Sequence, residues 1–263
     1  ITKKIELAEQ QLTLLLADAD KANKIPRTLD ANGNMHWTRD GFDWTEGFFP
    51  GTCWYLYEST KDVKWKIAAE KFQTQFESHK KNTFNHDLGF VFSSSYGNGY
   101  RITKNNHYKE VLIEAANSLM TRFSPTVGSL KSWDVNNGWQ AERDWEFPVI
   151  IDNMMNLELL YKASILTDDS KYKNAATTHA KTTMKNHFRT DNSSFHVVDY
   201  NPNNGEVRSK QTAQGYADSS AWARGQAWGI YGFTLCYRYT KNAEFLEQAQ
   251  NIADFVTNYN GTT

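Results

Sequence analysis

Two aspartates lie in segments where a charged side chain is unexpected. Asp152 stands in the apolar run "FPVIIDNMMNLELLY" at 147–161, which predicts a buried helix, and Asp87 stands in "HDLGF" at 86–90. A buried carboxylate must be paired, hydrogen-bonded or kept partly protonated, because an isolated buried charge is strongly destabilising. A structural polar network around Asp152 and an N-cap role for Asp87 are the structural alternatives. Two carboxyl groups on buried helices are also what acid–base chemistry on a sugar requires.

A third segment combines aromatic, cationic and small side chains. The run "SSAWARGQAWG" at 219–229 predicts a helix in which alanine and glycine recur every fourth residue from Ala221, a face suited to close packing. Arg224 and Trp228 lie one turn apart on another face. If this arginine is buried, as the segment predicts, a protein or ligand carboxylate must neutralise it. Nine tryptophans in the chain, several beside polar residues, fit either stacking against sugars or the filling of a core.

Other kinds of chemistry find little support in the sequence. His196 in "SFHVVDY" is a single histidine, and no HExxH pair, glycine-rich phosphate loop or GxSxG turn is present. Cys53 and Cys236 lie far apart in apolar context, so we expect two buried thiols rather than a disulfide or a metal site. With a net charge of -1, no basic field attracts nucleic acid or a membrane surface.

Amphipathic and uniformly apolar segments alternate along the chain. Helices with a single apolar stripe are predicted at 2–20, 61–79, 105–122, 169–187 and 241–258. Segments poor in charge, which predict fully buried helices, lie between them at 45–59, 88–98, 146–162 and 219–239. This alternation is typical of an array of αα-hairpins. Strand signals are weak, with one candidate at 194–200, and no linker divides the chain, so we expect residues 1–263 to form a single domain.

These motifs together resemble the unsaturated glucuronyl hydrolases, glycoside hydrolase family 88. The resembling segments are "DWTEGFFPG" (43–51), "HDLGF" (86–90), "IIDNMMN" (150–156), "SFHVVDY" (194–200) and "TAQGYADSSAWARGQAWGIYGF" (212–233). The resemblance implies an all-α fold, an (α/α)6 toroid of helical hairpins, and about nine of its twelve helices are expected in this chain. The C-terminal third of the family pattern is expected to be missing, which would leave apolar inner faces exposed. The related unsaturated rhamnogalacturonyl hydrolases share this architecture.

The resemblance also implies roles for individual residues. Asp152 is expected to be the general acid and base, and Asp87 to hold substrate hydroxyls and to favour the protonated form of Asp152 through its like charge. Substrate-contacting positions of the family match Trp44, His86, Phe90, Trp133, His196, Gln214, Trp222, Arg224 and Trp228. Trp139 is a rival to Trp133, because the region around both matches the family least well.

The family acts on the unsaturated uronic acid that polysaccharide lyases leave at the non-reducing end. Protonation of the C4=C5 vinyl ether at C4 and addition of water at C5 give a hemiketal, which opens the ring and releases the neighbouring sugar. The expected partners are unsaturated disaccharides or oligosaccharides, without nucleic acid or membrane, and no cofactor or metal is expected. The alternatives are a rhamnogalacturonyl-type hydrolase acting on pectin fragments, and a non-catalytic sugar-binding toroid or inactive fragment. A bacterial source is expected, with a periplasmic or cytoplasmic location left open because the chain shows no signal peptide.

Overall fold

The computed structural model describes residues 2–258, which contain nine α-helices, shorter 3₁₀ and π segments, and seven short strands. The chain divides into two compact units. The first unit runs to residue 81 and includes 90–115, and the second comprises 82–89 and the chain from 116 onward. None of the helices between residues 2 and 258 has the length and apolarity of a membrane span.

The first unit is built from helical hairpins and one β-hairpin. It comprises α1 (Thr2–Ala22), β1 (Pro26–Leu29), β2 (Met35–Trp37), α2 (Phe48–Thr60), α3 (Val63–Gln73), a 3₁₀-helix (Thr74–Lys81), most of a π-helix (Gly89–Ser93), α4 (Tyr96–Thr103) and most of α5 (Asn106–Met120). α2 ends where Lys61 takes a left-handed conformation, and Asp62 caps α3 by accepting from the Lys64 N–H. Trp54 Nε1 donates to Gln73 Oε1 at 2.9 Å, which joins the two helices of this hairpin.

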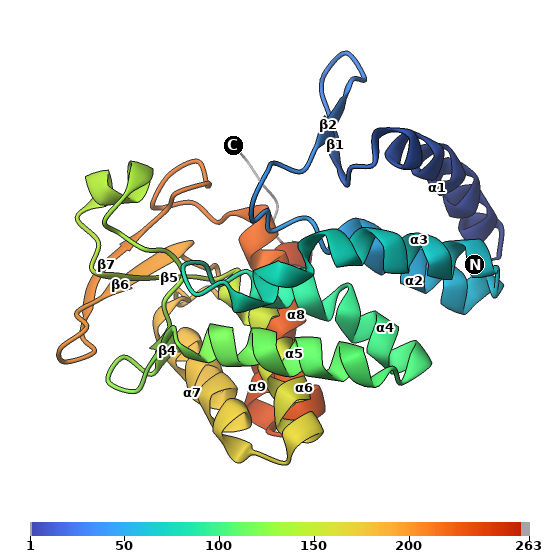
Figure 1. Ribbon diagram of the computed structural model, residues 1–263. Helices are drawn as coiled ribbons and strands as arrows, with labels where there is room; N and C mark the ends of the chain where they lie inside the picture. The colour runs from blue at the N-terminus through green and yellow to red at the C-terminus, as the bar shows by residue number, and fades with distance from the viewer. Residues whose placement is uncertain (1, 259–263) are drawn as a thin grey trace. The chain divides into compact units, whose positions relative to one another are not determined.

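The second unit combines helical hairpins with a small sheet. It comprises the end of α5, β3 (Phe123–Ser124), β4 (Ser129–Leu130), a 3₁₀-helix (Gly138–Arg143), β5 (Phe147–Ile150), α6 (Asn153–Thr167), α7 (Ser170–Asn186), β6 (Val197–Tyr200), β7 (Val207–Gln211), α8 (Ala223–Thr240) and α9 (Ala243–Asn258). β5, β6 and β7 form an antiparallel sheet in that order. α6 packs against α7 and α8, and α8 packs against α9 (Figure 1). Gly232 permits the approach of α8 to α6, because a Cβ there would lie 2.4 Å from Met154 Cβ.

The predicted order of amphipathic and apolar helices along the chain is confirmed. The five amphipathic segments fold as α1, α3, α5, α7 and α9, and three of the apolar segments contain most of α2, α6 and α8. The fourth, 88–98, holds the π-helix and only the start of α4, and α8 is buried along part of its surface rather than all round. Cys53 and Cys236 are buried free thiols, as the sequence predicts. The alanine and glycine face predicted at 219–229 also packs closely against its neighbours, since a Cβ on Gly225 would lie 3.0 Å from Ile151 Cγ2.

The predicted starts of two further buried helices are also wrong. The segments 146–162 and 219–239 open with a strand and a loop, and α6 and α8 begin only at Asn153 and Ala223. β-Branched residues with a preceding proline favour a strand in the first case. The sequence also predicts a strand only at 194–200, whereas the described residues hold strands of two to five residues elsewhere. Strands this short contain too few residues to display an alternating pattern.

Candidate active site

Asp152 stands at the junction between β5 and α6. It is the residue immediately before the helix, not inside it as the sequence predicts, and its side chain makes no capping hydrogen bond. The residue is 8% exposed, and its Oδ2 has no hydrogen-bond partner among residues 2–258. His196 Nε2 lies 3.6 Å from that oxygen. A buried carboxylate oxygen that is not engaged in a protein hydrogen bond is available for proton exchange with a bound molecule.

His196 is held in one tautomer by the loop that precedes α8. It lies directly before β6, and its own carbonyl accepts the Ile151 N–H, which extends the pairing of β5 with β6 toward Asp152. The backbone N–H groups of Ala213 and Gln214 donate to His196 Nδ1 at 3.0 and 3.1 Å. Since Nδ1 accepts both, the neutral ring carries its hydrogen on Nε2, the atom nearest to Asp152.

Asp87 forms a second pair with the histidine that precedes it. Its Oδ1 lies 3.2 Å from His86 Nε2, and Asp87 is 9% exposed. On the other side of the ring, His86 Nδ1 faces the Asn156 side-chain amide nitrogen at 3.3 Å. The amide is the donor, so this histidine also carries its hydrogen on Nε2 and directs it at a carboxylate.

The two histidine–aspartate pairs belong to one electrostatic group. Burial lowers the pKa of His86 to about 3, and the negative charge of Asp152 opposes this shift. His196 also acts on His86, in the direction of a lower pKa. A proton or charge placed on any member of the group therefore alters the others.

A glycine brings the Asp87 segment against α6. A Cβ added to Gly89 would lie 2.3 Å from the Cα of Asn156, closer than any side chain can be accommodated without moving backbone. "DLG" thus requires its glycine for a close approach to Asn156, which lies in the first turn of α6, just beyond Asp152. The local sequence places Asp87 and Asp152 on segments that touch.

Two tryptophans flank the His196 ring. The Trp222 ring lies 4.5 Å from it and the Trp133 ring 6.1 Å from it, measured between centroids. Trp133 is buried, whereas its rival Trp139 is 43% exposed and packs on the outer side of Trp133 at 5.1 Å. Of the two candidates, Trp133 is therefore the one in contact with the histidine.

Arg224 is exposed, so the prediction that it is buried is wrong. It stands in the first turn of α8, where its guanidinium lies 4.5 Å from the centroid of the Trp222 ring and donates to Gln214 Oε1. Gln214 thus supplies one acceptor to the guanidinium, whose planar fork of donors is suited to an anionic ligand. Trp228 lies one turn further along α8 and is half-buried.

Two predicted contact residues lie in the first unit. Trp44 precedes α2 and Phe90 lies in the π-helix, and their rings meet edge to face with centroids 5.5 Å apart. Trp44 is half-buried and Phe90 is buried.

Arg122 is a positioning residue that the sequence does not reveal. It ends a segment predicted to be an amphipathic helix, yet it is 7% exposed. Its guanidinium donates to the carbonyls of Thr83 (2.6 Å) and Lys131 (2.7 Å) and to Asp134 (3.0 Å). It therefore ties the start of the His86–Asp87 segment to the β4 region. No pattern in the sequence signals this burial, because an arginine at the end of an amphipathic segment is ordinarily exposed.

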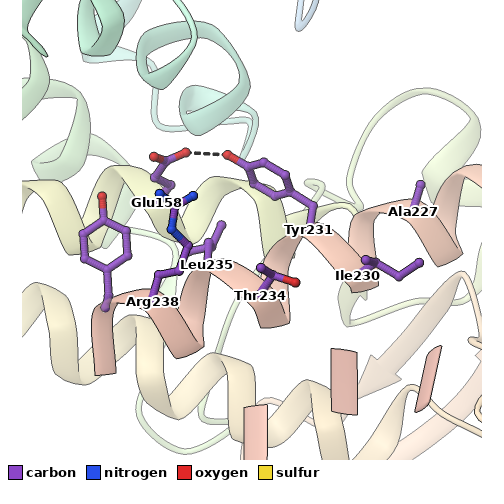
Figure 2. A pocket seen from close by; sticks show the side chains of 8 residues that line it. Glu158, Ala227, Ile230, Tyr231, Thr234, Leu235 and Arg238 are labelled. Atoms are coloured by element: carbon purple, nitrogen blue, oxygen red, sulfur yellow. Dashed lines mark hydrogen bonds between the residues drawn. The ribbon is translucent and has the colours of Figure 1, made fainter. Parts of the chain in front are cut away.

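A cavity of about 660 Å³ along α6 and α8 holds none of the predicted site residues. Figure 2 shows Glu158 of α6 facing side chains of α8, and its carboxylate accepts a hydrogen bond from Tyr231. This single, already bonded carboxylate offers no acid–base pair. In residues 2–258 no group of three or more His, Cys, Asp or Glu side chains is arranged to hold a metal ion.

Known proteins show strong likeness to this chain. An unsaturated glucuronyl hydrolase of Formosa agariphila is 45% identical over 235 residues, which are 89% of this chain and 58% of that protein. An unsaturated chondroitin disaccharide hydrolase of Streptococcus agalactiae is 33% identical over 261 residues, which are 98% of this chain and 64% of that protein. A solved structure of an unsaturated glucuronyl hydrolase specific for heparin matches with a TM-score of 0.87 and 43% identity, over 93% of this chain and 65% of that one.

The chain thus spans about six tenths of the length of these relatives. Their structural likeness confirms the predicted fold class, the all-α (α/α)6 toroid of the unsaturated glucuronyl hydrolases. The family model for Glycosyl Hydrolase Family 88 matches residues 19–262. Since that match covers almost the whole sequence, the chain belongs to Glycosyl Hydrolase Family 88.

Proposed function

We propose that this protein hydrolyses the unsaturated uronic acid at the non-reducing end of lyase-generated disaccharides and oligosaccharides. The observation that carries the proposal is the buried Asp152 oxygen, which has no hydrogen-bond partner among the described residues and faces the protonated nitrogen of His196. The names of the relatives, unsaturated glucuronyl hydrolase and unsaturated chondroitin disaccharide hydrolase, support the same substrate class. The relatives come from bacteria, and we place this protein in a bacterial periplasm or cytoplasm.

In the proposed reaction Asp152 exchanges a proton twice. Its carboxylic acid donates to C4 of the vinyl ether, and the resulting positive charge is shared by C5 and the ring oxygen. Water adds at C5 and returns a proton to the Asp152 carboxylate, which restores the acid. The hemiketal then opens and releases the neighbouring sugar, so no nucleophile attacks C1. His196 Nε2–H stabilises the carboxylate between the two transfers, because its tautomer is set by backbone donors on Nδ1.

The surrounding residues have roles in binding. Asp87, held by His86, accepts hydrogen bonds from sugar hydroxyls. The guanidinium of Arg224, supported by Gln214, binds the uronate carboxylate or a neighbouring hydroxyl. Trp133 and Trp222 offer aromatic faces to the apolar faces of the sugar rings. Trp44, Phe90 and Trp228 complete the proposed set of contact residues.

The test measures loss of the ultraviolet absorbance of the conjugated enoate when an unsaturated disaccharide is added. Asp152→Asn removes the exchangeable proton with little change in volume, and we expect kcat to fall by roughly 10²–10⁴-fold, the range for a general acid–base group. Asp254→Asn, at an exposed position of α9, is the matched control and should retain the full rate. Full activity of Asp152→Asn would exclude Asp152 as the proton donor, and an intact absorbance with the unaltered protein would exclude the reaction itself.

A further inference from the structure

The first unit contains a cavity that none of the roles above explains. It has a volume of about 410 Å³ and is formed by the β1–β2 hairpin and the loop that follows it. We call it the hairpin pocket, and its side chains include Arg27, His36, Trp37, Arg39, Asp43 and Trp44. Trp44 is also one of the predicted sugar-contacting residues, so the hairpin pocket adjoins a residue already proposed to bind substrate.

Two arginines of the hairpin pocket are oriented by bonds to only one of their nitrogens. Arg27 Nε donates to Asp43 Oδ2 at 3.0 Å, and Arg39 Nε donates to the carbonyl of Phe42 at 2.9 Å. The terminal nitrogens of both guanidinium groups make no hydrogen bond or ion pair to other residues in the described range 2–258. Each guanidinium is thus held at Nε, and its two terminal nitrogens form a planar pair of donors. This geometry binds carboxylate and sulfate groups.

Asp43 anchors this arrangement without cancelling its charge. It is 2% exposed, and its Oδ1 accepts from the Thr45 N–H and hydroxyl at 3.0 and 2.8 Å. Burial alone would raise the pKa of Asp43, but the Thr45 hydrogen bonds and the charge of Arg27 hold it below its usual value. Among the side chains that line the hairpin pocket, one carboxylate therefore opposes two guanidinium groups, and the carboxylate of Asp30 lies beside His36 at 3.9 Å from its Nε2.

The walls of the hairpin pocket are aromatic. Trp37 and Trp44 are both half-buried. Trp44 is held in place by edge-to-face contacts with Phe48 and Phe90, at centroid distances of 5.9 and 5.5 Å. Rigid tryptophan faces next to charged donors suit a ligand with an apolar face and an anionic rim, which describes a sugar ring bearing a sulfate or a carboxylate.

We propose that the hairpin pocket binds an anionic sugar unit of the oligosaccharide substrate, with its ring against Trp37 or Trp44 and its sulfate or carboxylate on Arg27 and Arg39. The inference rests on the proposed function, because it assigns to that substrate a preference for negatively charged sugars. The hairpin pocket would then contribute to affinity for charged substrates, while the proton transfers stay with Asp152.

Kinetics of the full-length protein on three unsaturated substrates test the proposal: an unsulfated disaccharide, the same disaccharide with a sulfate group, and an unsulfated tetrasaccharide that carries a second uronate. The key variant is Arg39→Ala, because Arg39, unlike Arg27, leaves no buried carboxylate unpaired when it is removed. We expect KM to rise about tenfold or more for a charged substrate, the effect of losing a charge-assisted hydrogen bond, with kcat unchanged. A rise on the sulfated disaccharide identifies sulfate as the ligand, and a rise on the tetrasaccharide identifies the carboxylate.

Three further variants guard against an indirect effect. Arg39→Lys retains the charge but not the fork, so it should restore KM only in part. Trp37→Leu should raise KM for the same charged substrate, and Lys21→Ala, which removes an exposed charge at the end of α1, should leave KM unchanged. If KM of Arg39→Ala and Trp37→Leu stays within about twofold of the unaltered protein on every substrate, the hairpin pocket is not a sugar site.

Binding distinguishes failure of this proposal from failure of the proposed function. If the unaltered protein consumes none of the three substrates, the hydrolase reaction is refuted, yet tryptophan fluorescence still reports whether the charged sugars bind. Fluorescence quenching that is lost in Arg39→Ala would then support the hairpin pocket on its own. Quenching that is equal in both proteins, or absent in both, would overturn it.

Discussion

The second unit buries three histidines whose neutral form the fold requires. Burial lowers the pKa of His86 and His179 to about 3 and that of His187 to about 4. His179 Nδ1 accepts the Leu130 N–H at 3.0 Å, and His187 Nε2 donates to the Val149 carbonyl at 3.0 Å. All three are less than 1% exposed, so a proton added to any of them creates a buried charge. We therefore predict that mild acid unfolds this unit.

The sign and size of the effect follow from these shifts. Because the folded-state pKa values lie below the ordinary value of about 6.5, the unfolded chain binds more protons at intermediate pH. The contribution of the neutral histidine rings to the free energy of unfolding is complete above about pH 6.5. It is lost as the pH falls toward the folded-state pKa values. Each histidine lowers the free energy of unfolding by about 1.4 kcal/mol per pH unit, so the three together give about 4 kcal/mol per unit. From neutral pH to about pH 5 the loss is about 6 kcal/mol, comparable with the total stability of a domain.

Urea unfolding followed by tryptophan fluorescence between pH 8 and pH 5 measures this slope. His179→Asn places an amide oxygen where Nδ1 accepts the Leu130 N–H but cannot be protonated, so we expect the slope to fall by about 1.4 kcal/mol per pH unit. His36→Asn, at a side chain that is 60% exposed, should leave the slope unchanged. An unchanged slope in His179→Asn, or a free energy of unfolding that stays level from pH 7 to pH 5, would refute the reasoning.

Two further predictions concern residues that position Asp87. Gly89→Ala places a Cβ 2.3 Å from Asn156 Cα, so we expect the free energy of unfolding to fall by about 2–3 kcal/mol in urea. We also expect kcat to fall in the enoate assay. A variant as stable and as active as the unaltered protein would contradict the close approach. Arg122→Leu removes the donor to two part-buried carbonyls and to Asp134, so the free energy of unfolding should fall by about 2–4 kcal/mol. An unfolding midpoint in urea that does not change would show that these acceptors find other partners.

Much of the candidate site could be located from the sequence, but its geometry could not. Asp152 and Arg224 can be identified from the sequence because each is a charged residue in an otherwise apolar segment. The position of Asp152 before α6 and the exposure of Arg224 are not visible, because they depend on where the preceding strand and loop end. The burial of Arg122 cannot be predicted for a similar reason. An arginine at the end of an amphipathic helix is ordinarily solvated, and its burial here depends on the Thr83 and Lys131 carbonyls and on Asp134.

The sequence by itself determines the alternation of amphipathic and fully apolar helices, because hydrophobic periodicity is a local property of a few turns. It also determines which segments carry unusual polar residues. Tertiary structure alone decides that His196 lies beside Asp152 and that Gln214 lies beside Arg224, since these partners come from segments joined only by the sheet and the loop before α8. Tertiary structure also decides the tautomer of His196. The two backbone N–H groups that donate to its Nδ1 belong to Ala213 and Gln214, which lie beyond β7, so the residues next to the histidine do not reveal them.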